Sequence, residues 1–230
     1  MANKTYLLVP GAWMGKIVWG KLITELTTMG CDVQSLNLGG LEGDGGTKAV
    51  GLMDHVKDVI DFIHSENLGE IILVGHSYSG FVTTIVADMI PEKISVLVFV
   101  ESFLPENGVS LLEAAGLDVE DEIGSINANN GFWPPPTKEE LIFQPHLTEE
   151  LLGFLTDNMI GHPGKTVTDK AIIRPGNLNK IPTIYIGANL SIPNKSNSNF
   201  KHIQFLELNG GHWPMLTKTK ELADLIKNIG

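Results

Sequence analysis

Short apolar runs alternate along the chain with longer stretches whose apolar residues recur at helical spacing. The apolar runs predict buried strands at residues 5–9, 32–38, 70–74, 94–100, 183–186 and 203–208. The amphipathic stretches predict helices at 18–29, 47–66, 81–90 and 214–229. Strands that are apolar on both faces and separated by helices are typical of a parallel sheet covered on both sides. The predicted fold class is therefore α/β.

Residues 104–179 break this alternation. They include Trp133, followed by three prolines, and several short helix-like pieces. A structureless loop of this length is uncommon in a compact domain, so a mostly helical cap is predicted, inserted between core segments 1–103 and 180–230. Ligands of open parallel sheets bind beyond the carboxyl ends of the strands. A cap inserted at this point would cover such a site.

The most informative motif is Gly75-His76-Ser77-Tyr78-Ser79-Gly80, between a predicted strand and a predicted helix. A serine held in a tight strand-to-helix turn is the layout of a nucleophile elbow. The two backbones nearly touch at such a turn, so the positions two before and two after the serine must be small. Gly75 and Ser79 occupy them, and Gly80 gives further room. An ordinary glycine-rich turn is the alternative interpretation of the short pattern alone.

A nucleophilic serine needs a base, and His212 is the candidate. It lies in the loop 209–214, after a predicted strand and before the last helix, which places it at the same sheet edge as Ser77. An imidazole there can take the hydroxyl proton and pass it to the leaving group. His76 is interpreted as structural, whereas His146 and His162 fall in the predicted cap, where one of them could line the pocket.

Composition narrows the function classes. The 230 residues are 43% hydrophobic and carry a formal net charge of -11, which suits one sizeable core and disfavours nucleic acid or an anionic membrane as partner. A cytoplasmic protein acting on small neutral molecules is expected. No apolar run approaches the ~20 residues of a membrane span, and the N-terminus does not resemble a signal peptide. With a single cysteine and no Cys/His cluster or phosphate loop, neither a disulfide nor a metal or organic cofactor is expected.

The chain resembles the α/β-hydrolases, and among them it is similar to the plant methylesterase and hydroxynitrile-lyase group and its bacterial relatives. The segments that carry the resemblance are 7–13, 75–80, 98–105, 181–186 and 211–218. The resemblance implies an α/β-hydrolase fold, Ser77 as nucleophile, His212 as base, and an oxyanion hole made by the backbone N–H groups of Ala12 and Tyr78. Pro10 stands where the family usually has histidine, so Trp13 is an alternative second donor.

The catalytic acid departs from the family pattern. The resemblance places it after the strand 183–186, where the matching position is Asn189, and no Asp or Glu occurs between Gly187 and Lys201. Glu101, directly after the strand 94–100, is the predicted acid, with Asn189 as a helper; some haloalkane dehalogenases similarly carry their acid there. A charge at the end of a buried strand is unfavourable unless it is paired. The alternative is a cap-facing glutamate bound to a lysine or a backbone amide.

The predicted function is a serine hydrolase that cleaves a small, fairly apolar carboxylic ester through an acyl-enzyme. A lactonase or C–C bond hydrolase with the same triad, and a receptor-like protein with little turnover, remain as alternatives, and a homodimer is left open. A hydroxynitrile lyase is disfavoured because Trp213 stands where that group has a lysine. The candidates to line the substrate pocket are aromatic: Trp13, Phe103, Phe132, Trp133 and Phe143.

Overall fold

The structure is a computed structural model, and it describes residues 4–42, 49–174, 176–188, 199–200 and 202–229. In this part of the chain, six strands form one all-parallel sheet with the order β2-β1-β3-β4-β7-β8. The strands are β1 (Thr5–Val9), β2 (Asp32–Ser35), β3 (Ile71–His76), β4 (Ile94–Val100), β7 (Thr183–Gly187) and β8 (Ile203–Glu207). The predicted α/β class is confirmed, and all carboxyl ends lie along one edge of the sheet.

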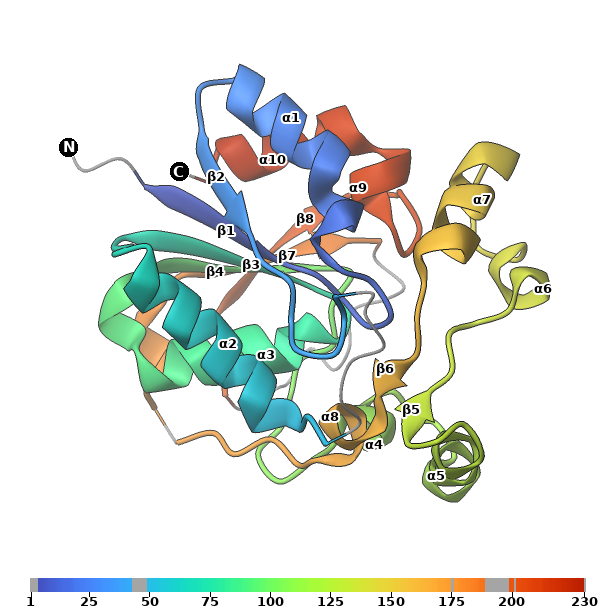
Figure 1. Cartoon of the computed structure of the whole chain (residues 1–230). Coiled ribbons are helices and arrows are strands. Elements are labelled where there is room, and N and C mark those ends of the chain that lie inside the picture. Colours follow the sequence, from blue (N-terminus) through green and yellow to red (C-terminus); the bar gives the residue numbers. More distant parts are fainter. Residues whose placement is uncertain (1–3, 43–48, 175, 189–198, 201, 230) are drawn as a thin grey trace.

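Helices cover both faces of the sheet (Figure 1). One face carries α1 (Gly20–Thr28), α9 (Pro214–Thr217) and α10 (Thr219–Lys227), and the other carries α2 (Leu52–Ser65) and α3 (Ser79–Met89). Side chains of a strand alternate between the two faces. Leu7 and Val9 of β1 therefore pack on the α2 and α3 side, and Tyr6 and Leu8 pack on the α1 and α10 side.

Three predicted boundaries are wrong. The helix predicted at 47–66 begins only at Leu52, because Gly51 is extended and residues 49 and 50 are not helical. The strand predicted at 32–38 ends at Ser35, because Leu36 and Leu38 are buried in the core without joining the sheet ladder. The helix predicted at 214–229 is divided into α9 and α10 at Lys218, whose backbone is not helical. The part of the chain that the structure describes also contains short 3-10 turns: η1 (Lys16–Trp19), η2 (Pro91–Lys93) and η3 (Leu178–Lys180).

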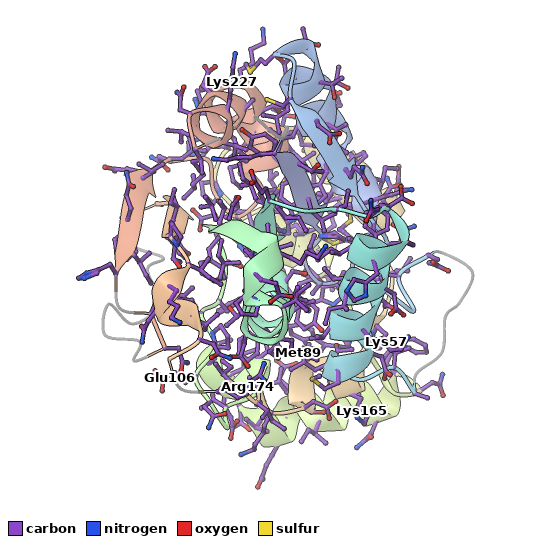
Figure 2. All side chains as sticks on the ribbon, turned by 90° about the vertical axis from the view of Figure 1, so that its left-hand side faces the viewer. Lys57, Met89, Glu106, Lys165, Arg174 and Lys227 are labelled. Carbon is purple, nitrogen blue, oxygen red and sulfur yellow. The ribbon has the colours of Figure 1, made fainter. Side chains whose placement is uncertain are left out.

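The helix α3, which follows the candidate nucleophile, is held firmly in the core. All its residues from Ser79 to Asp88 are buried, and α2 packs beside it (Figure 2). At its far end the carboxylate of Asp88 is paired with Arg174, at 3.1 Å between Nε and Oδ2, and Figure 2 shows Arg174 close to Met89. The turn that precedes this helix therefore has a rigid support.

Most of the segment 104–179 lies beyond the carboxyl ends of the strands, toward the right of Figure 1, and its last residues run back to the far end of α3, where Arg174 pairs with Asp88. Its elements are α4 (Leu111–Ala114), α5 (Val119–Ala128), β5 (Phe132–Trp133), α6 (Lys138–Leu141), α7 (Glu149–Asn158), β6 (His162–Pro163) and α8 (Gly164–Thr168). β5 and β6 form a small antiparallel pair with Trp133 opposite His162. Its division from the core at 103/104 and 179/180 stays a prediction, because side chains such as Leu112 and Val167 pack into the same core as α2 and α3. Among the described residues, no helix combines the length and apolarity needed to cross a membrane.

Candidate active site

Ser77 occupies the sharp turn between β3 and α3. Its backbone φ is +51°, a left-handed conformation that is uncommon for residues other than glycine. The side chains around it must be small: a Cβ on Gly75 would lie 2.6 Å from Thr83 Oγ1 and 2.8 Å from the Ser79 carbonyl oxygen. The hydroxyl of Ser79 donates to the carbonyl of Pro10 and joins the turn to the loop after β1. The sequence motif therefore folds into a strained turn that presents a serine at the sheet edge.

His212 reaches Ser77 from the loop between β8 and α9. Its Nε2 lies 2.9 Å from Ser77 Oγ, so the neutral imidazole can accept the hydroxyl proton. The neighbouring His76, predicted to be structural, donates from Nε2 to the His212 carbonyl at 2.7 Å. Burial lowers the pKa of His212 to about 4. Burial, with the nearby His212, lowers the pKa of His76 to about 3, so both rings are neutral at neutral pH.

Glu101 directly follows β4, next to the strand that carries Ser77. It is 7% exposed and has a φ of +44°. Its N–H donates to the Ile186 carbonyl at 3.0 Å, and its Oε1 accepts from the N–H of Ala188 at 2.7 Å. Within the described residues, no hydrogen bond joins this carboxylate to the His212 ring, so its role as the acid stays a prediction. Asn189, the predicted helper, lies outside the described residues.

The two predicted oxyanion donors flank the serine. Among the described hydrogen bonds, neither the Ala12 N–H nor the Tyr78 N–H has a protein acceptor, and both residues border the cavity in front of Ser77. The alternative donor, Trp13, is wrong, because its N–H is already donated to His162 Nδ1 at 3.3 Å. The oxyanion hole formed by Ala12 and Tyr78 stays a prediction.

A cavity of about 620 Å³ opens in front of Ser77 and His212. Three predicted pocket residues, Trp13, Phe103 and Trp133, line it. Phe132 and Phe143 do not. Phe143 is 86% exposed, pointing from the cap into solvent, and Phe132 packs over Gly161 instead. The rest of the wall comes largely from the cap: Leu111, Ala115, Leu117, Glu122, Ser125, Pro134, Pro135, Pro136, Thr137, Glu140, Leu141 and Gln144.

The wall of this cavity is largely apolar and includes two carboxylates. Among the described residues that line it, Glu122 and Glu140 are acidic and none is Lys or Arg. Glu122 accepts a hydrogen bond from the Trp133 indole N–H at 2.7 Å, which holds that ring in place. The site therefore offers contact area and hydrogen bonds to an uncharged ligand, but no cation to bind an anionic one.

Two histidines are buried near Tyr78: His55, which sequence reasoning did not place at the site, and His162, which was named as a possible pocket residue but does not line the cavity. His55, from α2, accepts a hydrogen bond from the Tyr78 hydroxyl at 2.9 Å and donates to the Gly39 carbonyl at 2.8 Å. His162, from β6, is fully buried, with its ring 4.7 Å from the ring of Tyr78. Burial lowers the pKa of both imidazoles. The only sequence signal for His55 was a polar residue on the inner face of an amphipathic helix.

Comparisons with known sequences identify the family. The model of the alpha/beta hydrolase family matches residues 6–225. A carbendazim hydrolyzing esterase of Nocardioides sp. (strain SG-4G) is 40% identical over 118 residues, which cover 49% of this chain and 46% of that protein. Methylesterase 8 of Arabidopsis thaliana is 34% identical over 133 residues, 54% of this chain and 49% of that protein. The chain thus spans about half the length of these curated relatives.

Solved structures give the same fold. An extracellular α/β-hydrolase from a Paenibacillus species, described as sharing structural and functional homology with tobacco salicylic acid binding protein 2, matches with a TM-score of 0.85 at 23% identity over 98% of both chains. A pyrethroid hydrolase from Sphingobium faniae JZ-2 matches with a TM-score of 0.72 at 20% identity, over 99% of this chain and 96% of that one. The resemblance stated from the sequence is confirmed: the chain belongs to the alpha/beta hydrolase family.

Proposed function

We propose that this protein is a serine hydrolase that cleaves small, fairly apolar carboxylic esters through an acyl-enzyme. The observation that carries the proposal is the 2.9 Å separation of Ser77 Oγ and His212 Nε2 at the wall of a 620 Å³ cavity. A hydroxyl becomes a competent nucleophile when a neutral base lies within hydrogen-bond reach. Relatives named as esterases and methylesterases support ester hydrolysis as the reaction.

In the proposed reaction, Ser77 attacks the ester carbonyl while His212 takes the hydroxyl proton. The negative charge that develops on the carbonyl oxygen is bound by the N–H groups of Ala12 and Tyr78, which have no protein acceptor among the described residues. Fixed donors of this kind contribute about 3–4 kcal/mol each to transition-state binding. His212 then protonates the departing alcohol, and the same steps with water release the acid.

The second half of the reaction regenerates the serine. Water enters the position of the departed alcohol, His212 removes its proton, and the ester bond to Ser77 breaks as the proton returns to the serine oxygen. The imidazolium that forms in each half is costly here, because burial lowers the pKa of His212 to about 4. Glu101, buried at the end of the neighbouring strand, is the proposed source of the compensating negative charge.

The cavity wall indicates the substrate class. The rings of Trp13 and Trp133 pack against each other, with centroids 4.3 Å apart, and form an aromatic side of the pocket. Flat apolar acyl groups suit such a surface, while the carboxylates of Glu122 and Glu140 disfavour anionic ones. A small alcohol such as methanol is consistent with the methylesterase names of several relatives.

The proposal is tested with p-nitrophenyl acetate and butyrate, with and without a serine-directed fluorophosphonate. We expect hydrolysis that the reagent abolishes, labelling confined to Ser77, and no activity in Ser77→Ala. A series of lactones and neutral methyl esters then compares ring opening with ester cleavage. Absence of labelling together with thermal stabilisation by an aromatic ester would instead identify a receptor with little turnover and overturn the proposal.

A further inference from the structure

Trp13 links the loop after β1 to the cap through every polar group it has. Its N–H donates to His162 Nδ1 at 3.3 Å, its carbonyl accepts from Ile160 N–H at 3.0 Å, and its indole N–H donates to the Trp133 carbonyl at 3.2 Å. All three partners belong to the segment 104–179. Trp13 has a φ of +64°, which a large side chain adopts only when its surroundings hold it there. The cap therefore fixes the conformation of this loop.

Among the three cap residues bound to Trp13, His162 also contacts Tyr78, the residue after Ser77. Its Nδ1 accepts from Trp13, the residue after Ala12, and its ring packs edge-on against the ring of Tyr78, with a centroid distance of 4.7 Å and an interplanar angle of 71°. Ala12 and Tyr78, whose N–H groups are the donors of the proposed oxyanion hole, both line the cavity. One imidazole from the cap thus touches the backbone next to one donor and the side chain of the other.

The hydrogen bonding of His162 is unfavourable for stability alone. Because Nδ1 accepts a hydrogen bond, the ring proton resides on Nε2, and this buried atom has no partner among the described residues. A buried donor without an acceptor is costly, and an apolar residue in the same space would avoid that cost. A role beyond packing accounts for a histidine at this position.

We propose that His162 is a positioning residue for the oxyanion hole. Through it the cap holds the N–H groups of Ala12 and Tyr78 in the positions from which both can donate to one oxyanion. The inference rests on the proposed function. It predicts that loss of the acceptor lets the loop 11–13 relax from its left-handed conformation. The donor of Ala12 then moves away from the developing negative charge, which weakens binding of the transition state and leaves binding of the uncharged substrate unchanged.

The test compares His162→Leu with His162→Asn. Asparagine places a carbonyl oxygen near the position of Nδ1 and can still accept from Trp13, whereas leucine cannot. We expect His162→Leu to lower kcat for p-nitrophenyl butyrate by about tenfold to 10²-fold. This loss does not exceed the loss of kcat that follows removal of one oxyanion-hole donor. KM should stay within about twofold of the wild-type value. His162→Asn is expected to recover most of kcat. Affinity for a trifluoromethyl ketone, which forms an oxyanion on Ser77, should fall in parallel with kcat.

Two further measurements separate positioning from stability and from the proposed function. Leu152→Ala truncates a buried cap side chain that packs in a different group of core residues from Trp13, and it serves as a control that is expected to lower the melting temperature. Hydrogen exchange of the peptide that contains residues 11–13 should accelerate in His162→Leu and not in His162→Asn, whatever reaction the protein catalyses. Unchanged exchange, or equal loss of kcat in both variants, overturns the positioning role. Activity that persists in Ser77→Ala overturns the proposed function instead.

Discussion

Replacing Glu101 by glutamine tests which group supports the candidate catalytic histidine. Glutamine has the shape of glutamate and keeps a carbonyl oxygen that can accept from Ala188 N–H, as Oε1 does at 2.7 Å. The fold is therefore expected to persist in Glu101→Gln. The change removes a negative charge at the end of β4, so a loss of turnover would report on that charge rather than on packing.

The expected magnitude follows from the burial of His212. Its pKa is lowered from 6.5 to about 4, which corresponds to about 3 kcal/mol against the imidazolium formed in the transition state. A nearby carboxylate favours the charged ring and offsets this cost. Three kcal/mol equals roughly 10²-fold in rate, and loss of the acid in a comparable triad costs about 10⁴-fold. We expect kcat of Glu101→Gln to fall by about 10²- to 10⁴-fold.

The assay is the pH dependence of kcat/KM for p-nitrophenyl butyrate, with Asn189→Ala as the matched control. His212 acts as a base only when it is neutral, so activity is present above its pKa and is lost as the pH falls through it. A carboxylate that supports the imidazolium favours the charged ring and raises its pKa, so if Glu101 is the acid, the acidic limb of Glu101→Gln should lie at lower pH than that of the wild type. If Glu101→Gln keeps its kcat and its acidic limb while Asn189→Ala loses turnover, Glu101 is not the acid.

Three other predictions concern the frame of the site. In Gly80→Ala the new Cβ would overlap the Phe103 carbonyl oxygen. Overpacking of this kind costs about 1–3 kcal/mol and should lower the melting temperature, measured by calorimetry, by roughly 2–12 °C. Gly20 has open space around it, so Gly20→Ala should leave the melting temperature unchanged. His76→Phe removes the donor to the His212 carbonyl and should lower kcat about tenfold, with recovery in His76→Gln, which keeps an N–H; equal loss in both would contradict this. Esters that carry a carboxylate should show kcat/KM about tenfold below matched neutral esters, because two carboxylates line the cavity and like charges repel. Equal rates would refute the charge argument.

The sheet was predictable because strands that are buried on both faces are short, continuous runs of apolar residues. The apolar runs gave all six strands of the main sheet, and the turn residues between them gave most boundaries within a few residues. The error at β2 has a physical origin: Leu36 and Leu38 are as apolar as strand residues and are equally buried, but they pack in the core after the ladder has ended. Hydrophobicity reports burial, and it does not report which backbone groups pair.

The site was predictable where chain order constrains it. Ser77 and His212 follow the ends of strands in one parallel sheet, so their meeting follows from topology. His162 and Phe143 lie in the cap, where no periodic pattern of apolar residues shows which way a side chain points. Phe143 was expected in the pocket and points to solvent, while His162, 149 residues away from Trp13 along the chain, contacts its backbone. Contacts of this kind depend on how the cap folds back on the core.

Three residues with strained backbones lie at the sheet edge that carries the candidate site, and one of them is held by the cap. Trp13, Ser77 and Glu101 have left-handed φ angles of +64°, +51° and +44°, and they follow β1, β3 and β4, which are neighbours in the sheet. Each such residue costs about 1–3 kcal/mol. The next strand holds two of them, through Ser77 N–H to the Val100 carbonyl and Glu101 N–H to the Ile186 carbonyl. Among the described contacts, Trp13 is held from the cap, through His162, Ile160 and Trp133, so a chain without residues 104–179 would lose this support of the loop after β1 even if the sheet still formed.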